Sequence, residues 1–316
     1  IGVKENKHVN HLTSEFPGSN MDDSCDFFSI NSFKELTSLE IKNLSEEELI
    51  FEVKGVDPSL VNALRRILIA EISTMAIENC IFYQNTSIIP DEVLAHRLGL
   101  IPIKADANLF NYKGESEEYS EFNYLTFKLH VVCGKEPMDV YSKELKWVPQ
   151  GNQLSRISDA KPVHDDILIA KLRPGQEIEA ELICCKGLGK THAKWSPVCT
   201  AYYRLLPDIC IKNSVKGERA EKLKELCPMG VFDIEDSGKA IVKNSLNCTM
   251  CRECVRQDEF IDDIELSKLK NEYEFHIESV GIYPPQLLLV KALEVLKSKC
   301  VSWKEIVNEA STKQDS

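Results

Sequence analysis

The chain has 316 residues, 43% hydrophobic and 28% charged, the composition of a soluble globular protein with one large domain or two medium ones. Its net charge of −12 argues against a protein whose main task is to bind nucleic-acid phosphates, because that task needs a basic face. The first residues lack the apolar core of a secretory signal, and no apolar run approaches the roughly 20 residues that span a bilayer. We therefore expect a reducing compartment, with the cysteines serving as buried apolar residues or metal ligands.

The chain begins with a predicted arm, a hairpin and a helix. Residues 1–34 are polar and aperiodic, which indicates a flexible arm. Two short apolar runs around an acidic turn in residues 39–56 predict a β-hairpin. A helix should follow, with Asp57 as its cap and Pro58 in its first turn. Its apolar stripe at helical spacing consists of Leu60, Leu64, Ile67 and Leu68.

The pattern of hydrophobic and polar residues changes in the middle of the chain. A second short helix is expected from residue 91 until Gly99 and Pro102 end it. Residues 106–200 consist of short alternating runs between Gly, Pro and Asn turns, and predict a β-rich domain. The predicted elements that follow are a strand in 196–211, a charged helix in 216–228, a cysteine-rich region, a strand in 271–281 and a C-terminal helix from Pro284.

Two features of the predicted helices leave a choice between packing within the chain and binding a partner. The C-terminal helix carries apolar residues at i, i+4, i+7 and i+11, namely Leu289, Leu293, Leu296 and Cys300. Such a stripe packs on the chain's own sheet, which periodicity alone favours, or on a helix of another subunit. Arg65 and Arg66 lie about 100° apart around their helix. Either these two side chains lie on a solvated face of the helix, or their planar guanidinium groups bind an acidic surface of a partner.

We find no catalytic motif. The stretch "CCKGLGKTH" (184–192) resembles a phosphate-binding loop, but the pattern needs glycine where Cys184 stands. A flexible Gly-rich turn after a strand is the better interpretation. The seven histidines show no spacing typical of catalysis or zinc binding, and no nucleophile elbow or carboxylate pair is evident.

The cysteines are the most unusual feature of the sequence. Cys248, Cys251 and Cys254 fall in "NCTMCREC" (247–254), two overlapping Cys-x-x-Cys motifs that bring three thiols around one centre. A fourth, Cys227, lies upstream and precedes a proline, as in bacterial ferredoxin patterns. Four thiolates also suit tetrahedral zinc, but zinc sites more often use two separated pairs. The spacing thus favours an iron–sulfur cluster, with zinc as the alternative and an unoccupied site as the third.

A cluster of this kind need not take part in redox chemistry. The sequence has no visible flavin, nicotinamide or radical-generating motif, so a structural clip that adds folding free energy is the expected use. An independent iron–sulfur electron carrier is the rival hypothesis.

Three long segments resemble a known family. Residues 61–103, "VNALRRILIAEISTMAIENCIFYQNTSIIPDEVLAHRLGLIPI", resemble the signature segment of α-like RNA polymerase subunits, a family that includes bacterial α and its archaeal counterparts. Residues 166–207 resemble the part particular to the larger α-like subunit shared by eukaryotic RNA polymerases I and III. Residues 275–297, "FHIESVGIYPPQLLLVKALEVLK", are similar to the family's closing strand and helix.

The resemblance implies an α+β fold like that of the α-subunit N-terminal domain. A dimerisation domain is interrupted by a β-rich insertion and carries a small ferredoxin-like cysteine region. The expected order is an arm (1–34), a first dimerisation segment (35–82), the insertion (83–203), and a second dimerisation segment (204–316) with cysteine-rich residues at about 225–260. Some relatives, notably archaeal ones, hold an iron–sulfur cluster with a cysteine pattern that Cys227, Cys248, Cys251 and Cys254 match. Many animal and fungal versions lack most of these cysteines.

The resemblance also implies a function. The chain would be a non-catalytic assembly subunit of nuclear and nucleolar RNA polymerases I and III, supporting rRNA, 5S rRNA and tRNA synthesis. It would heterodimerise with the small α-like subunit, and the pair would form a platform for the two largest subunits, with DNA contacted only through the complex. The implied partner interface consists of Leu60, Leu64, Arg65, Arg66, Leu68, Leu289, Leu293 and Leu296, with the two arginines facing the second-largest subunit.

Overall fold

The computed structural model describes residues 29–314, except 115–116, 158 and 257–258. The fold is mixed α+β, as expected, and divides into two compact units. We call the first unit the cysteine unit. Among the described residues, it consists of those up to 42, together with 51–58 and 203–275. The larger unit consists of residues 43–50, 59–202 and those from 276 onward. No helix in the described ranges is long and apolar enough to cross a membrane.

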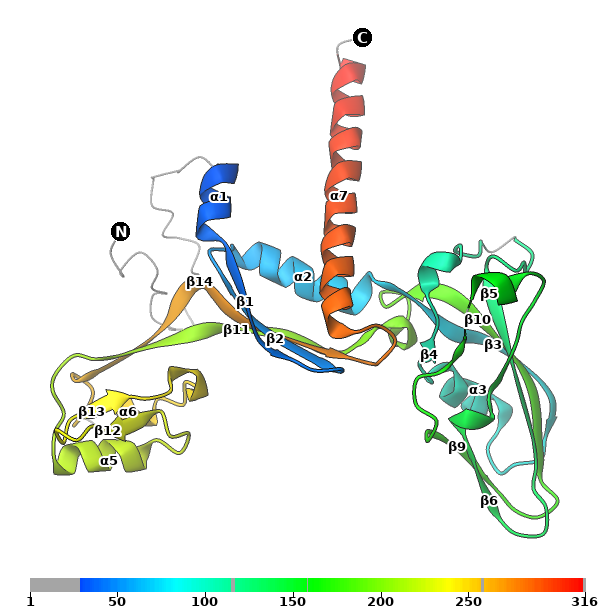
Figure 1. The fold of residues 1–316 in the computed structure, drawn as a ribbon, viewed down its shortest axis with the longest axis horizontal. Coiled ribbons are helices and arrows are strands. Elements are labelled where there is room, and N and C mark those ends of the chain that lie inside the picture. Colours follow the sequence, from blue (N-terminus) through cyan, green and yellow to red (C-terminus); the bar gives the residue numbers. More distant parts are fainter. Residues whose placement is uncertain (1–28, 115–116, 158, 257–258, 315–316) are drawn as a thin grey trace. The chain divides into compact units, whose positions relative to one another are not determined.

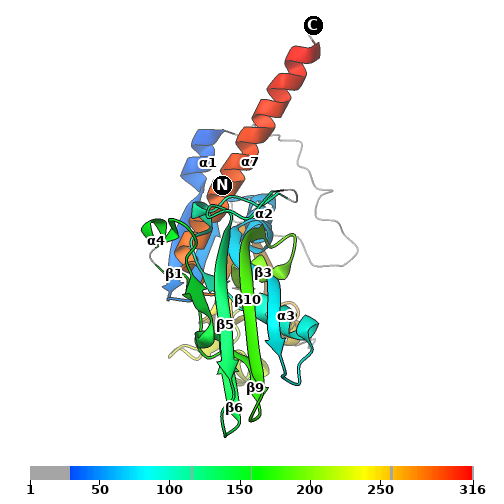
Figure 2. The same cartoon turned by 90° about the vertical axis from the view of Figure 1, so that its right-hand side faces the viewer.

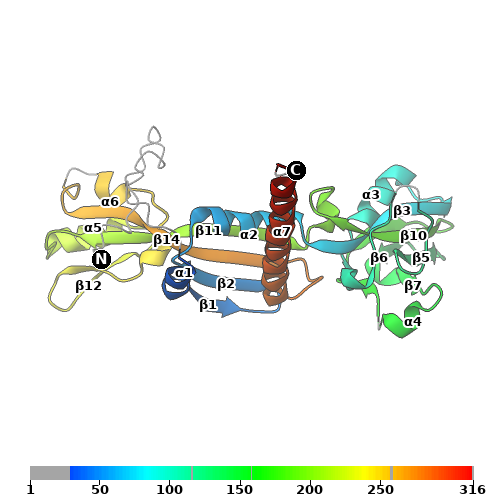
Figure 3. The same cartoon turned by 90° about the horizontal axis from the view of Figure 1, so that it is seen from above.

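Four strands form one sheet in the order β1-β2-β14-β11. They are β1 (Ser38–Leu44), β2 (Glu48–Lys54), β14 (Ile264–Ser279) and β11 (Val198–Ile211), drawn side by side in Figure 3. The hairpin predicted for 39–56 is confirmed by β1 and β2. The strand β2 is mostly buried, whereas every residue of β1, at the sheet edge, is exposed.

The larger unit contains a second sheet in the order β3-β10-β5-β7, made of β3 (Ser73–Asn85), β10 (Glu177–Leu188), β5 (Tyr124–Val132) and β7 (Lys146–Val148). All of its pairings are antiparallel. Figure 2 shows β3, β10 and β5 side by side, with α3 (Asp91–Gly99) next to β3. One apolar core joins these elements, including Met75, Leu94, Phe127 and Leu182.

Shorter elements complete this unit. The strands β6 (Met138–Tyr141) and β9 (Leu168–Leu172) pair, as do β4 (Ile103–Lys104) and β8 (Lys161–Pro162). The remaining short helices are α4 (Gln153–Arg156) and 3-10 turns at Ala107–Leu109, Ser142–Glu144 and Ala193–Trp195. The two long helices of the unit are α2 (Pro58–Ala70) and α7 (Pro285–Gln314), which confirm the predicted helices.

The cysteine unit holds a small subdomain between β11 and β14 (Figure 1). It contains α5 (Glu218–Leu226), the hairpin β12 (Phe232–Ile234) with β13 (Ala240–Val242), a 3-10 turn at Ser245–Asn247, and α6 (Glu253–Arg256). Its own apolar core includes Val215, Leu223, Phe232 and Phe260. The charged helix predicted for 216–228 is confirmed by α5.

The structure corrects two sequence-based expectations. Residues 1–28 of the predicted arm lie outside the described residues, but Ile30–Leu36 forms the helix α1 rather than flexible chain. The β-rich region does not begin at 106, because β3 pairs with β10 from Ser73 onward. The pattern of hydrophobic and polar residues placed the start of the β-rich region too late in the chain. The strand β3 lies between two helices, and the strand with which it pairs is distant in the sequence.

Candidate functional site

The four predicted ligand cysteines line one cavity of the cysteine unit. Cys227 follows the end of α5, Cys248 follows a 3-10 turn, and Cys251 and Cys254 lie before and within α6. All four border one small cavity of about 20 Å³. The rest of its lining is mostly apolar, including Leu226, Phe232 and Leu266. Residues that are up to 27 positions apart (254 − 227) are thus brought together at one place.

The backbone between the cysteines is unusual. Met250 and Arg252 adopt φ angles of 59° and 63°, the left-handed region that residues other than glycine rarely occupy. The Met250 backbone N–H donates a hydrogen bond to the Cys248 sulfur at 3.4 Å. Strained backbone of this kind occurs at functional sites, where surrounding contacts hold it in place. Here it turns the chain so that Cys248, Cys251 and Cys254 all border the cavity.

Burial favours the neutral form of two of the cavity thiols, Cys248 and Cys254. It raises the pKa of the Cys248 thiol above its usual value, and raises the pKa of Cys254 to about 11. Neighbouring thiols add to both shifts. A soft metal would bind the thiolates, so its binding would release protons and strengthen with rising pH.

The sulfur atoms of the described cysteines are not gathered as closely as the ligands of a single zinc ion. In the described part of the chain, no three cysteine sulfur atoms all lie within 4.8 Å of one another. A tetrahedral zinc ion with Zn–S bonds of about 2.3 Å places its sulfur ligands about 3.8 Å apart. The cysteines would therefore have to move closer together to hold a single zinc ion.

A second group of potential ligands lies in the larger unit. His130, Glu177 and Glu179 have ligand atoms within 4.8 Å of one another on neighbouring strands β5 and β10. His130 Nε2 lies 3.0 Å from Glu177 Oε1, and the imidazole is largely exposed. We interpret the group as a solvent-exposed hydrogen-bonded cluster on the sheet surface.

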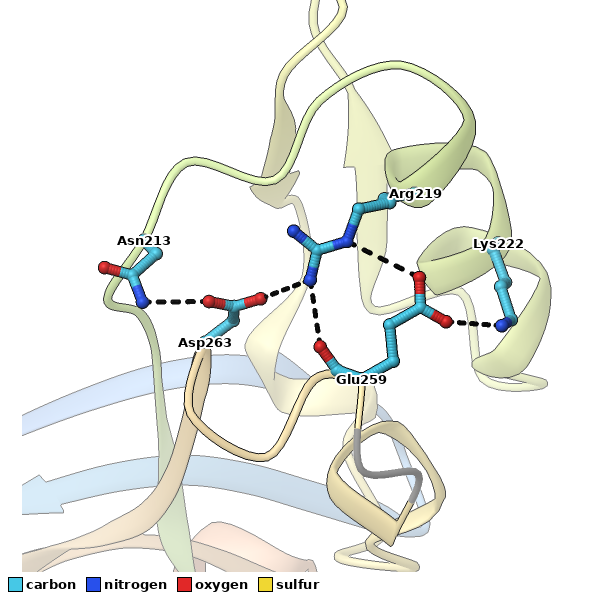
Figure 4. A network of polar contacts seen from close by, with 5 residues as sticks. All are labelled: Asn213, Arg219, Lys222, Glu259 and Asp263. Carbon is cyan, nitrogen blue, oxygen red and sulfur yellow. Dashed lines mark hydrogen bonds and ion pairs between the residues drawn. The ribbon is translucent and has the colours of Figure 1, made fainter.

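A polar network closes the base of the cysteine subdomain (Figure 4). We call Asn213, Arg219, Lys222, Glu259 and Asp263 the neck clamp. Asn213, just after β11, donates to Asp263, just before β14, at 2.8 Å. Arg219 of α5 donates to Asp263 at 2.7 Å and to the Glu259 carbonyl at 2.9 Å, and Lys222 pairs with the Glu259 carboxylate. The clamp thus ties α5 to both chain segments that connect the subdomain to the sheet.

The neck clamp predicts a pH-dependent stability. Hydrogen bonds from Asn213 and then Arg219 hold the pKa of Asp263 below its ordinary value. Because the pKa is lower in the folded state, the carboxylate's contribution is fully present above the unfolded pKa of about 4 and is lost as pH falls through the folded value. We expect Asp263→Asn to be less stable than wild type at pH 7, and the difference to shrink below about pH 4. Denaturant unfolding at a series of pH values measures the difference in free energy of unfolding between variant and wild type. Asp262→Asn removes a charge outside the clamp, so its free energy of unfolding should follow that of wild type at every pH.

The predicted partner residues divide between surface and interior. Leu60 is 37% exposed, Leu64 is half-buried and Leu68 is fully buried, so Leu68 packs inside its own chain. On α7, Leu293 is 47% exposed, and Leu289 and Leu296 are half-buried. The side of α7 that packs within the chain instead carries Leu288 and Ala292, both fully buried. Lys299 pairs with Glu71, beyond the end of α2, at 2.9 Å.

The two arginines of α2 differ in their surroundings. Arg65 is half-buried and donates two hydrogen bonds to the Asn62 side chain, at 3.0 and 3.2 Å. Arg66 is exposed. Arg66 is therefore the more available of the two for a partner.

Sequence reasoning missed the role of the Gly-rich stretch. The predicted turn after a strand is present at residues 189–191, directly after β10 ends at Leu188, but the chain packs closely on both sides of that point. A Cβ at Gly187 would lie 2.2 Å from the Trp195 ring, and one at Gly189 would lie 2.2 Å from the Ile69 carbonyl oxygen of α2. The two closely spaced glycines were the signal in the sequence that could have revealed this packing. Because they lack a Cβ, they allow the backbone to approach the end of α2 and the Trp195 ring closely.

Comparisons with known proteins show to which family the chain belongs. Residues 75–199 match the family described as the RNA polymerase Rpb3/RpoA insert domain. The subunit rpac1 of DNA-directed RNA polymerases I and III from Dictyostelium discoideum is 42% identical over 96% of this chain and 91% of its own length. The chain belongs to the RPAC1 family. The human and Saccharomyces cerevisiae members are 42% and 36% identical, over 91% and 95% of this chain and 89% and 96% of their own lengths.

An archaeal polymerase subunit is also similar to this chain. Rpo3 of the archaeon Methanosphaera stadtmanae is 38% identical over 86% of this chain. The residues that match the insert-domain family, 75–199, overlap most of the insertion predicted at 83–203.

Proposed function

We propose that the chain is a non-catalytic assembly subunit of nuclear and nucleolar RNA polymerases I and III. The proposal is supported by relatives that are named as subunits of DNA-directed RNA polymerases I and III. In this role it supports synthesis of rRNA, 5S rRNA and tRNA, while catalysis belongs to the large subunits. The observation that carries the proposal is apolar surface left open on α7, where Leu293 is 47% exposed. A free-standing soluble protein gains nothing from a helix with an uncovered apolar stripe, whereas an obligate complex covers it.

The proposed partner on this surface is the small α-like subunit. Leu60 and Leu64 of α2 and Leu289, Leu293 and Leu296 of α7 supply the contact. The heterodimer forms the platform for the two largest subunits, with Arg66 offered to the second-largest subunit. DNA is contacted only through the assembled complex, in keeping with the net charge of −12.

Heterodimerisation is tested by an aspartate placed in the stripe. We expect Leu293→Asp to reduce co-purification of the small α-like subunit at least tenfold, because the charge would be buried without a partner. Ser298→Asp places the same charge on an exposed position of the same helix and should leave co-purification unchanged. Quantitative mass spectrometry of the tagged chain, expressed with its polymerase partners, gives the ratio. Equal recovery from the two variants would contradict the proposed interface.

We further propose that Cys227, Cys248, Cys251 and Cys254 hold a structural metal centre in a ferredoxin-like region. Their donor chemistry fits a soft metal, because four thiols border one cavity whose other lining residues are mostly apolar. The three-plus-one spacing of these cysteines along the chain favours an iron–sulfur cluster, with zinc as the alternative. The bound group would add folding free energy by fixing the loop that carries Met250 and Arg252.

A further inference from the structure

A cavity of about 500 Å³ lies beside the end of β10 in the larger unit. Its walls come from β3, β10, the loop after Phe110 and the turn after β10, all within one compact unit. Its volume is in the range of ligand-binding pockets. It shares no lining residue with the cysteine cavity or with the proposed contact to the small α-like subunit. We call it the insert cavity, lined among others by Asn79, Tyr112, Lys113, Tyr119, Lys186 and Gly187.

Two lysines of the insert cavity are held over aromatic rings. Lys186 Nζ lies 4.8 Å from the centre of the Tyr112 ring and donates a 2.9 Å hydrogen bond to the Phe110 carbonyl. Lys113 Nζ lies 4.8 Å from the centre of the Tyr119 ring. In the described part of the chain, neither ammonium group is within ion-pair distance of a carboxylate. Because a lysine ammonium has three N–H donors, each still has donors to offer a ligand.

The positive charge in the insert cavity is only partly compensated. Burial lowers the pKa of Lys186, the Asp106 carboxylate opposes this shift, and the Lys291 ammonium adds to it. The acidic residue that lines the cavity, Glu78, already forms an ion pair with Lys194. A negatively charged group that entered the cavity would therefore be stabilised there.

The insert cavity also contains an open strand edge. The last residue of β10 that pairs with β5 is Cys185, opposite Tyr124, but β10 continues to Leu188. Over residues 186–188 it is paired only with β3, on its other side. All three residues line the cavity. Backbone N–H and C=O groups at a free strand edge accept an added strand.

These two features select the ligand. A strand edge binds an extended peptide through its backbone, and the lysines favour an acidic side chain on that peptide. Nucleic acid is disfavoured, because the loop that carries Tyr119 also carries Glu117, Glu118 and Glu121, which would repel a chain with one phosphate per nucleotide. A peptide can bring a single carboxylate to the lysines without that repulsion.

We propose that the insert cavity binds an extended peptide segment of a partner protein, with an aspartate or glutamate side chain paired with Lys113 or Lys186. The segment adds to β10 beside residues 186–188, in line with β5. Three residues of strand span about 10 Å, so the cavity holds a segment of about four residues. The exposed rings of Tyr112 and Tyr119 supply apolar contact for its other side chains. This site is independent of the proposed heterodimer contact.

Selection from a library of random seven-residue peptides tests the ligand class. The bait is the full chain, purified with its polymerase partners. We expect the selected peptides to be enriched about threefold in aspartate and glutamate, and their affinity to fall about tenfold for Lys113→Glu/Lys186→Glu. The control Lys128→Glu/Lys146→Glu reverses two charges on exposed residues of β5 and β7 outside the cavity, and should keep wild-type affinity. Peptides without acidic bias, or equal affinity for both double variants, would overturn the proposal.

Changes made in the selected peptide test the same site without depending on how the variants fold. Replacement of its acidic residue by the matching amide should weaken binding to wild type about tenfold. N-methylation of every second backbone nitrogen should abolish binding in one register and spare it in the other, because alternate N–H groups of a strand point to opposite sides. Equal effects in both registers, or displacement of the peptide by octauridylate at a lower concentration than by unlabelled peptide, would contradict an added strand. If no peptide binds while Leu293→Asp still blocks heterodimerisation, the assembly function stands and only this site is lost.

Discussion

Gly189→Ala is expected to lower the free energy of unfolding of the larger unit by about 3 kcal/mol. The added Cβ would lie 2.2 Å from the Ile69 carbonyl oxygen and 3.2 Å from the Ala70 Cα, both backbone atoms that cannot turn away. The loop would have to leave the end of α2, and the 2.9 Å hydrogen bond from the Lys190 N–H to the Ala70 carbonyl would be lost. That bond satisfies one of the carbonyl groups left open at a helix end.

The comparison variant for Gly189 is Gly134→Ala. No atom lies within 4 Å of a Cβ at Gly134, and its φ is not positive, so its stability should stay within about 0.5 kcal/mol of wild type. Denaturant unfolding of the two variants gives the difference. Because α2 also carries Leu64, we expect Gly189→Ala to weaken heterodimerisation as well. Equal stability of both alanine variants would show that the loop does not pack against α2 as described.

Cys251→Ser is expected to remove most of the metal from the purified protein and to destabilise the cysteine subdomain. Cys251 is exposed, so the change from sulfur to oxygen alters packing little and mainly removes a ligand. Structural zinc sites of this kind contribute on the order of 10 kcal/mol of apparent binding free energy, so loss of one ligand has a large effect. The visible colour of the wild type, with its iron and zinc content, identifies the group.

The control for Cys251 is Cys210→Ser, which is also exposed but does not border the cavity. It should keep the metal content and stability of wild type. Nucleotide addition per assembled polymerase should be the same in both variants, because the proposed site is structural. A wild-type protein with neither iron nor zinc would end the metal proposal.

Local sequence patterns were sufficient for the helices α2, α3, α5 and α7 and for the choice of cysteines, although they missed α1. The start of α2 followed from Asp57 and Pro58, and the end of α3 from Gly99, because caps and helix breakers act over one turn. The Cys-x-x-Cys spacing identified three residues that border one cavity. The resemblance of three segments was sufficient to identify the family.

The sequence by itself determined which side chains this protein has to offer: an apolar helix stripe, a set of thiols and an acidic surface. Only the tertiary structure decided which of them are available. Leu68 and Leu288 are buried, whereas Leu293 on the same kind of stripe is 47% exposed. Likewise β3 joins β10 across about a hundred residues, and Gly189 contacts α2 rather than a ligand. Periodicity reports that a face is apolar, but exposure depends on contacts between distant segments, which local pattern does not encode.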